Sequence, residues 1–308
     1  MTDLIAVIAP VFGLMAAGFF ASWSGLLSAR AGEGLSEFVF TLSIPALIFR
    51  TMATAALPDV QPWGYWLAYF SATALVWAAV MLATRRLLNV PHRQSVIAGL
   101  IASQSNTVLV GIPLLLRAYG EPGAVPLFLL IAVHLPLMLT AAAVMIEGGG
   151  GFDALGLAKR LALNPVLLSL FLGVAFRFSG LPLGGPPKAV IDGLAGASIP
   201  CALVAMGMSL RRYGVAAEFG LASLIAGFKL IVHPALVYLF AFKVFAMPPV
   251  WAGVAVLFAA MPCGVNSYLF AERYKTGVAM CSSAIALTTL LSLGTCLFWL
   301  WMLGVAHS

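Results

Sequence analysis

"SQSNTVLVGIPLLLRAYG", residues 103–120, is the stretch that decides how this chain folds. The rest of the chain is almost pure hydrocarbon, yet this stretch opens with five polar residues, Ser103 to Thr107, and then carries Gly111 and Pro113. Proline removes a backbone donor and clashes with the preceding turn of a helix. Backbone groups freed in this way are costly when they face lipid. We therefore expect an interrupted membrane helix whose broken part is buried in protein or lines a wet cavity.

The composition of the whole chain sets the fold class. Of 308 residues, 62% are hydrophobic and 8% are charged, and the mean hydropathy is +1.06. A soluble domain carries about 25% charged residues. No water-soluble fold could bury this much apolar surface, so the composition predicts an all-α polytopic membrane protein. The net charge of +6 comes from scattered basic residues, which does not favour nucleic-acid binding.

Ten stretches are long and apolar enough to be read as spans, since a spanning helix needs about 20 apolar residues. The loops between them are short, and no soluble domain is expected. The predicted spans are residues 4–22, 34–56, 64–84, 95–118, 124–146, 162–179, 188–210, 217–241, 250–273 and 278–302.

The distribution of Lys and Arg predicts the orientation in the membrane. One set of alternate loops holds ten basic residues, from Arg30 to Lys275, and the other set holds four. The set with more positive charge is expected in the cytoplasm, so both termini are predicted on the outer side of the inner membrane. The N-terminus "MTDLIAVIAP" has an acid and no basic segment, so we expect the first apolar run to be a span and not a cleaved signal peptide.

The chain also matches itself without gaps after a shift of 155 residues. Each predicted half has five spans, an odd number, so the second copy would enter the bilayer upside down relative to the first. Inverted repeats of this kind are typical of secondary transporters. The matches are Pro10 on Pro165, Gly18 on Gly173, Ser24-Gly25-Leu26 on Ser179-Gly180-Leu181, Ser43-Ile44-Pro45 on Ser198-Ile199-Pro200, and Tyr119 on Tyr274.

The repeat pairs the fourth span with the ninth, and both are interrupted near the middle. Proline alone would be compatible with a simple kink in a packed helix. The asparagines need polar partners, however, and two broken helices in matched positions indicate a transport site. The residues proposed to bind substrate at these interruptions are Asn106, Thr107 and Pro113 in the fourth span and Pro262 and Asn266 in the ninth.

Four motifs resemble those of the auxin efflux carrier family, and most closely its short bacterial, malonate-permease-like members. They are "SNTVLVGIPLLLRAYG", "MPCGVNSYLFAERYKTG", "TLSIPALIFRTMA" and "ASIPCALVAMGMSL", and the resemblance extends over essentially the whole chain. It implies a fold shared with bile-acid transporters and sodium/proton antiporters. In that fold the interrupted spans four and nine cross beside the substrate.

The internal repeat implies a division into two halves, and the resemblance implies a scaffold and a core. Residues 1–146 and 162–308 would form the two five-helix repeats, joined by a short cytoplasmic linker, 147–161. Spans one, two, six and seven would form a scaffold, and spans three to five and eight to ten a mobile core. A homodimer through the scaffold spans is expected by the same resemblance.

Three ionisable side chains lie deep within predicted spans. Lys229 is about 18 Å into span eight, and an intramembrane lysine should face the protein interior. It could hold a substrate carboxylate, replace a sodium ion, carry a coupled proton, or merely bond the carbonyl groups of the crossing helices. His233 lies one turn later, and His134 lies mid-way along span five. Both are candidates for proton coupling, although buried neutral histidines are more often structural.

Two scaffold residues have open interpretations. Arg50 could extend to the lipid headgroups or attract anions at the outer mouth. Ser43, in the repeated Ser-Ile-Pro segment, could donate to a substrate carboxylate or pack against the kink at Pro45. No acid is expected within the membrane, which disfavours cation transport and carboxylate-based sodium sites.

These observations favour a secondary transporter of a small organic anion, such as malonate or an auxin-like acid. The alternative is a receptor or regulatory protein that uses the transporter fold without transport. We expect no enzyme activity, because no catalytic or metal-binding cluster is recognisable, and no cofactor. The four cysteines are unpaired in spacing and predict neither disulfides nor zinc. The sequence leaves open the substrate, the direction of flux and the coupling ion.

Overall fold

A computed structural model describes residues 2–55, 63–147, 162–213 and 218–305, with residues 155, 156 and 159 between them. Within these ranges the chain is helical, and a single isolated β-bridge is its only extended pairing. Seven helices are long and apolar enough to cross a membrane, and three further apolar helices are shorter. The protein is therefore a polytopic membrane protein. Most of the predicted linker 147–161 lies outside the described residues.

Each predicted apolar stretch coincides with one helix or with a short series of helical segments. In the first half these are α1 (Thr2–Trp23), α2 (Ala29–Phe38) with η1 (Val39–Ser43) and α3 (Ile44–Thr54), α4 (Trp63–Leu87), α5 (His92–Ser103), η2 (Thr107–Gly111) with α6 (Ile112–Tyr119), η3 (Glu121–Gly123) and α7 (Ala124–Glu147). In the second half they are α9 (Pro165–Phe178), α10 (Gly185–Leu210), α11 (Phe219–Gly227), η4 (Phe228–Val232), α12 (His233–Tyr238), η5 (Leu239–Val244), α13 (Pro249–Ala260), α14 (Val265–Arg273) and α15 (Val278–Met302).

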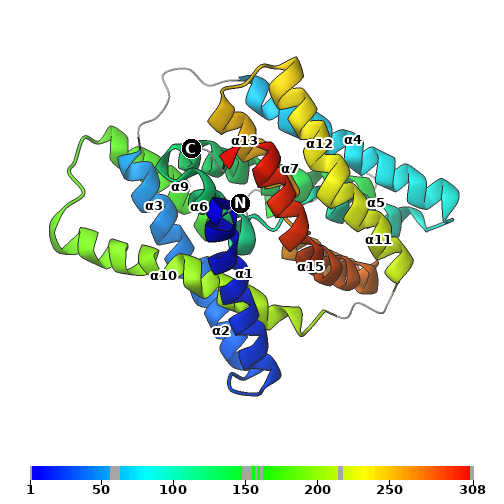
Figure 1. Cartoon of the computed structure of the whole chain (residues 1–308), viewed down its shortest axis with the longest axis horizontal. Coiled ribbons are helices and arrows are strands. Elements are labelled where there is room, and N and C mark those ends of the chain that lie inside the picture. Colours follow the sequence, from blue (N-terminus) through cyan, green and yellow to red (C-terminus); the bar gives the residue numbers. More distant parts are fainter. Residues whose placement is uncertain are drawn as a thin grey trace.

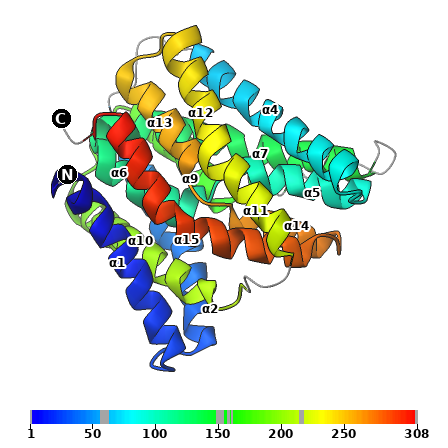
Figure 2. The same cartoon turned by 45° about the vertical axis from the view of Figure 1, so that its right-hand side comes forward.

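The helices pack in two groups (Figures 1 and 2). In one group α10 runs across α1, α2 and α3, and α9 lies along α3. In the other group α4 packs on α5, α11 on α15, and α12 on α13. The two groups meet where η2 and α6 touch α10 and where α1 touches α15.

Close packing of α1 on α10 depends on two glycines. A Cβ atom on Gly18 would lie 2.2 Å from the carbonyl oxygen of Val204, and one on Gly207 would lie 1.9 Å from that of Met15. Neither position tolerates a side chain, so the two backbones touch directly. Small residues allow this approach in membranes, where van der Waals packing drives helix association. Direct backbone contact between α1 and α10 therefore holds the first group of helices together.

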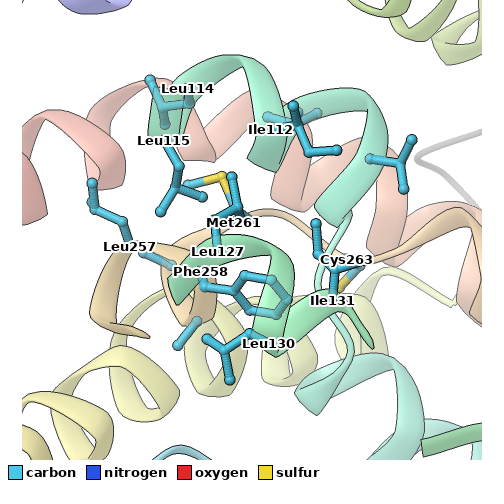
Figure 3. Packing of buried hydrophobic residues seen from close by; sticks show 14 of the residues in the cluster. Ile112, Leu114, Leu115, Leu127, Leu130, Ile131, Leu257, Phe258, Met261 and Cys263 are labelled. Carbon is cyan, nitrogen blue, oxygen red and sulfur yellow. The ribbon is translucent and has the colours of Figure 1, made fainter. Parts of the chain in front are cut away.

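The second group has an apolar core between α6, α7 and α13. Figure 3 shows Leu115 of α6 beside Met261, and Leu130 of α7 beside Phe258 of α13. These side chains are buried. The interruption at Met261 lies directly against this core, so the break is supported by close packing on its apolar side.

Three wide, π-type turns occur in the described helices directly before a proline. The residue preceding Pro45, Pro113 or Pro234 donates its N–H to the carbonyl group five positions earlier: Ile44 to Val39, Ile112 to Thr107 and His233 to Phe228. A proline ring clashes with the carbonyl group four positions before it, and widening the turn relieves that clash. Pro10, Pro136 and Pro200 lie inside continuous α-helices, so proline alone does not determine the wide turn.

Candidate functional site: the paired interruptions

The two interrupted helices meet at their breaks. Residues 104–106 separate α5 from η2, and residues 261–264 separate α13 from α14. The Asn106 N–H donates to the Pro262 carbonyl at 2.8 Å, and the Gly264 N–H donates to the Gln104 carbonyl at 3.1 Å. These bonds make an antiparallel bridge centred on Ser105 and Cys263. Backbone groups freed by the breaks therefore satisfy one another, as the absence of water in a bilayer requires.

The C-terminal end of α13 would otherwise leave carbonyl groups without partners. Pro262 has no N–H to offer Phe258, and the Cys263 N–H donates instead to Thr288 Oγ1 at 3.1 Å. The free carbonyl groups bond side chains from elsewhere in the chain. Phe258 accepts from the Ser105 hydroxyl at 2.6 Å, and Ala259 accepts from the Lys229 ammonium at 2.8 Å.

Lys229 is completely buried, and each of its three donors has an acceptor. Besides the Ala259 carbonyl, the ammonium donates to Ser105 Oγ at 2.7 Å and to His233 Nδ1 at 3.3 Å. All three acceptors are neutral, and no Asp or Glu is buried among the described residues. The cation is thus satisfied in hydrogen bonds but has no countercharge near it. The carbonyl-bonding role left open for Lys229 above is present in the structure.

His233 and His134 belong to the same buried network. An ammonium only donates, so His233 Nδ1 must accept, and its Nε2–H then donates to Thr73 Oγ1 at 3.1 Å. His134 lies 3.2 Å from the Tyr69 hydroxyl through Nδ1, and its Nε2 lies 3.5 Å from the Ser105 amide. Both histidines are therefore connected to the break in the fourth predicted span.

Asn106 points away from that network. Its Nδ2 donates to the sulfur atom of Met206 on α10 at 3.2 Å, and the side chain is 4% exposed. Successive side chains of an extended backbone point to opposite faces, so Ser105 faces Lys229 while Asn106 faces the first group of helices. The predicted site residues therefore do not form one cluster. Thr107 and Pro262 are buried at the same interruptions, and Asn266 is half-buried in the first turn of α14. Pro113 is buried too, but it lies inside α6, beyond the break, where the sequence had placed it at the interruption.

A cavity of about 570 Å³ lies between the two groups of helices on the side of the breaks that Asn106 faces. Ser209 lines it and also touches the Met206 sulfur at 3.7 Å, which connects the cavity to Asn106. Burial raises the pKa of Tyr213, another lining residue, to about 12, so its phenol stays neutral. The lining residues are Ser22, Ala29, Gly32, Glu33, Ser36, Phe40, Leu109, Ala205, Met208, Ser209, Arg211, Arg212, Tyr213, Val265 and Leu269.

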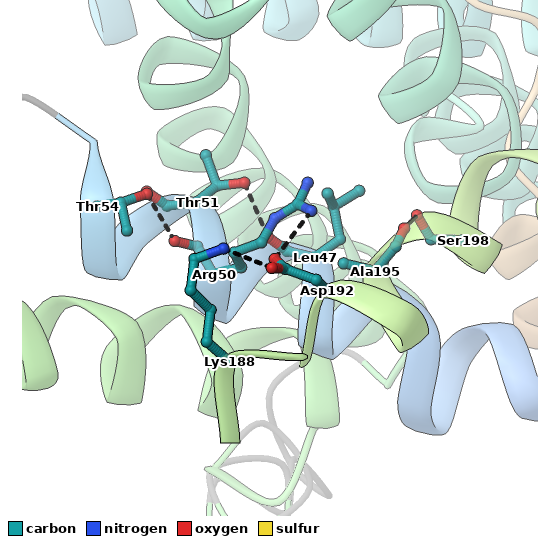
Figure 4. Close-up of polar contacts among 8 residues, drawn as sticks. All are labelled: Leu47, Arg50, Thr51, Thr54, Lys188, Asp192, Ala195 and Ser198. Carbon is teal, nitrogen blue, oxygen red and sulfur yellow. Dashed lines mark hydrogen bonds and ion pairs between the residues drawn. The ribbon is translucent and has the colours of Figure 1, made fainter. Parts of the chain in front are cut away.

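The remaining predicted site residues lie in the first group of helices. Arg50 Nη1 lies 3.4 Å from Asp192 Oδ1, and Lys188 donates to Asp192 Oδ2 at 2.5 Å (Figure 4). The expectation that no acid lies within a span was wrong for Asp192, which lies two turns inside α10 and is stabilised there by these cations. The Ser43 hydroxyl is fully buried and has no hydrogen-bond partner.

Sequence reasoning missed several residues of the paired interruptions. Gln104 and Ser105 belong to the polar run that opens the decisive stretch, so their position was a usable signal. Gln104 Oε1 accepts a hydrogen bond from Ser267 of α14, across the break. Thr288 and Met206 have no signal in the sequence, because a threonine or methionine in an apolar helix is ordinary.

Comparison with known proteins supports the membrane transport reading. A family model described as "Membrane transport protein" matches residues 3–155 and 152–300. A protein of Rhizobium meliloti (strain 1021) named "Putative malonate transporter" is 31% identical over 96% of this chain and 94% of its own length. An "Uncharacterized transporter" of Methanothermobacter thermautotrophicus is 25% identical over 94% of this chain and 95% of its own. The "Lysosomal cholesterol signaling protein" of Mus musculus is 24% identical over 95% of this chain but only 36% of its own.

The first family match extends through the helices of the first half, and the second covers those of the second half up to residue 300. Together they span nearly the whole chain, including both interruptions. The protein therefore belongs to the membrane transport protein family, the auxin efflux carrier family that its motifs resemble, and is not an enzyme.

Proposed function

We propose that this protein is a secondary transporter of small organic anions, carboxylates such as malonate or an auxin-like acid, and that it works by alternating access. The observation that carries the proposal is the pairing of the two interrupted helices beside a cavity. Asn106, at the break, is linked through Met206 to Ser209 of the cavity wall. Paired interruptions of this kind position substrate near the middle of the membrane in secondary transporters.

The charges near the crossing favour an anion. Lys229 has no acidic partner among the described buried residues, so its field is not cancelled locally. Leu109 and Val265 line the cavity from the first turns of η2 and α14, where helix dipoles favour negative charge. Two arginines, Arg211 and Arg212, line the same cavity, although Arg212 is paired with Glu33.

The helix bounds support an inverted repeat. Adding 155 to the ends of the series Ala29–Thr54 gives 184 and 209, against Gly185–Leu210 for α10. The same shift takes Ala124–Glu147 to 279 and 302, against Val278–Met302 for α15. Ten spans in two repeats, 1–146 and 162–308, with both termini on the outer side, are the arrangement we propose.

In this proposal the group α1, α2, α3, α9 and α10 is the scaffold, and the second group is the core that moves against it. The glycine contacts between α1 and α10 keep the scaffold rigid. A rigid scaffold and a separately packed core permit an elevator-like movement. The protein would lie in a bacterial inner membrane, as a homodimer through its scaffold helices.

Malonate is the first substrate to test, because a relative that matches 96% of this chain is named for it. Lys229, His134 and His233 are the candidates for proton coupling, since they share one buried network. Lys229 reaches the substrate through Ser105, whose neighbour Asn106 faces the cavity side, so we assign Lys229 a positioning and electrostatic role. We assign direct contact with the substrate to Asn106, Thr107 and Asn266.

The experiment is uptake of radiolabelled malonate by proteoliposomes that contain the purified protein, in buffers of varied pH and sodium. We expect saturable uptake that excess unlabelled malonate inhibits and that Asn106→Ala reduces. A panel of other dicarboxylates and aryl carboxylates extends the test. Absence of saturable flux for every carboxylate would overturn the proposal.

One observation favours a second function. The mouse relative named for cholesterol signalling contains a region similar to this chain within a much longer protein. A receptor or regulatory protein that binds without transport is therefore the alternative. Carboxylate-dependent thermal stabilisation of the purified protein without flux in proteoliposomes would favour it.

A further inference from the structure

Some of the residues that line the cavity have counterparts in the other copy of the repeat. We name the cavity described above the open mouth. A shift of 155 residues carries five of its lining residues onto a second set, which we name the closed mouth together with Asp192. The correspondences are Glu33 to Lys188, Phe40 to Ala195, Ala205 to Arg50, Met208 to Ala53 and Ser209 to Thr54.

The closed mouth is a compact group at the other end of α10. Figure 4 shows Arg50 of α3 facing Lys188 and Asp192 of α10, with Thr54 one turn after Arg50 on the same helix. The helix α6 contacts α10. Its repeat mate, α14, lines the open mouth through Val265 and Leu269 and makes no comparable contact with α2 or α3. At the closed mouth side chains of α3 and α10 therefore meet, whereas the corresponding residues of the open mouth line a cavity.

The charges of the two mouths differ. In the closed mouth two cations from two helices converge on one carboxylate: Arg50 on Asp192 Oδ1 and Lys188 on Asp192 Oδ2. The corresponding places in the open mouth hold Ala205 and Glu33, so the repeat architecture itself does not require this cationic pair. Arg50 and Asp192 side chains are 35% exposed and Lys188 is 46% exposed, so ligands in water can reach them.

Two converging cations are the arrangement that recognises a carboxylate with both of its oxygens. Asp192 supplies such a carboxylate from the chain itself. We propose that Arg50 and Lys188 form a carboxylate-binding entrance on the closed side, and that Asp192 occupies this entrance until a substrate carboxylate displaces it. The inference rests on the proposed function, because the carboxylate that Arg50 and Lys188 would bind is the substrate of the proposed anion transport.

The test is protection of a cysteine in the closed mouth from a neutral thiol reagent. Thr54→Cys, one turn after Arg50, serves as the reporter. Cys201, the only cysteine of the described residues that is not buried, is first replaced by serine. Malonate is the probe, and chloride replaces it in the reference buffer so that the ionic strength stays constant.

In the reporter protein malonate should slow labelling. Asp192→Asn should lower the half-protecting concentration roughly two- to fivefold, as expected when one competing partly exposed charge is removed. Asp192→Glu should behave as the reporter does. Arg50→Gln combined with Lys188→Gln should abolish protection. Glu37→Gln, an exposed acid of α2 that corresponds to Asp192 after the shift of 155 residues and lines neither mouth, is the matched control and should change nothing.

The inference is overturned if Asp192→Asn does not lower the half-protecting concentration, or if the Arg50 and Lys188 double variant keeps protection. Absence of protection at every malonate concentration in both the reporter and Asp192→Asn overturns it as well. The labelling readout does not depend on flux. If malonate protects the reporter protein but no carboxylate flux is measured in proteoliposomes, the result contradicts the proposed function and leaves the carboxylate-binding entrance supported.

Discussion

The ammonium group of Lys229 lies 2.8 Å from the carbonyl oxygen of Ala259, in the last turn of α13. The two residues come from different helices, and their bond places a positive charge at the negative end of a half-helix dipole. The same ammonium also holds Ser105 of the other interruption. One buried cation thus fastens both breaks together, which explains why its insertion cost is tolerated.

Replacement of Lys229 by methionine should destabilise the protein while keeping an apolar stem of similar length. The carbonyl group of Ala259 and the nitrogen of His233 would lose their donor, and unsatisfied buried groups cost about 1–3 kcal/mol each. We expect a clear fall in melting temperature in detergent. Lys243→Met, on an exposed position of η5, is the control and should melt with the parent. Equal melting of Lys229→Met and parent would contradict the capping role.

Replacement of Gly264 by alanine should separate the two interruptions. A Cβ atom there would lie 2.8 Å from the carbonyl oxygen of Ser105 and 3.2 Å from the side chain of Gln104. Overpacking of a buried site costs about 1–3 kcal/mol, and here it would act on the bridge itself. We expect lower stability and loss of malonate uptake. Gly294→Ala, in α15, has no neighbour within 4 Å of the added atom and should keep both properties.

Two substitutions of Asn106 distinguish an anion site from a neutral one. Among the described residues the Asn106 side chain donates only to a thioether, a weak acceptor, so Asn106→Ala should cost little stability. A lost contact to a charged carboxylate is worth about 1.5–3 kcal/mol, or roughly 10- to 150-fold in affinity. Asn106→Asp adds a negative charge and should weaken malonate binding further than Asn106→Ala. Thermal-shift titration measures both, and tighter binding by Asn106→Asp would exclude an anionic substrate at this position.

The proposed orientation predicts which thiols react from which side of the membrane. Ser24→Cys lies in the turn after α1, next to the basic residues that are expected in the cytoplasm. Thr54→Cys lies at the end of α3, on the other side. In a Cys201→Ser background, a membrane-impermeant maleimide added to whole cells should label Thr54→Cys and leave Ser24→Cys unlabelled until the cells are lysed. The reverse pattern would place both termini in the cytoplasm.

Much of the fold follows from local sequence. The apolar runs predicted the helices, because a chain in lipid must satisfy its own backbone hydrogen bonds within each segment. The break of the ninth span could also be predicted, since Pro262 cannot donate and Gly264 has no side chain. Pro113 lies seven residues beyond the break of the fourth span, where a wide turn accommodates it. The run from Ser103 to Thr107 marked the fourth span as the one that needs polar partners.

The hydrogen-bond partners of these polar residues could not be predicted from the sequence. Lys229 could bind substrate, a proton or carbonyl groups, and only the packing of α13 against η4 placed Ala259 beside it. Arg50 could extend to headgroups, but α10 places Asp192 next to it.

The sequence by itself determined the position of each helix along the chain, the two helices that break and the division of basic residues between the loops. These features depend on residues that are near one another in the chain. Only the tertiary structure decided that Ser105 faces Lys229 and that Asn106 faces Met206. Those choices depend on contacts across 124 and 100 residues of chain, which no local periodicity records. The physical reason is that a break has no preferred direction of its own until neighbouring helices supply its hydrogen-bond partners.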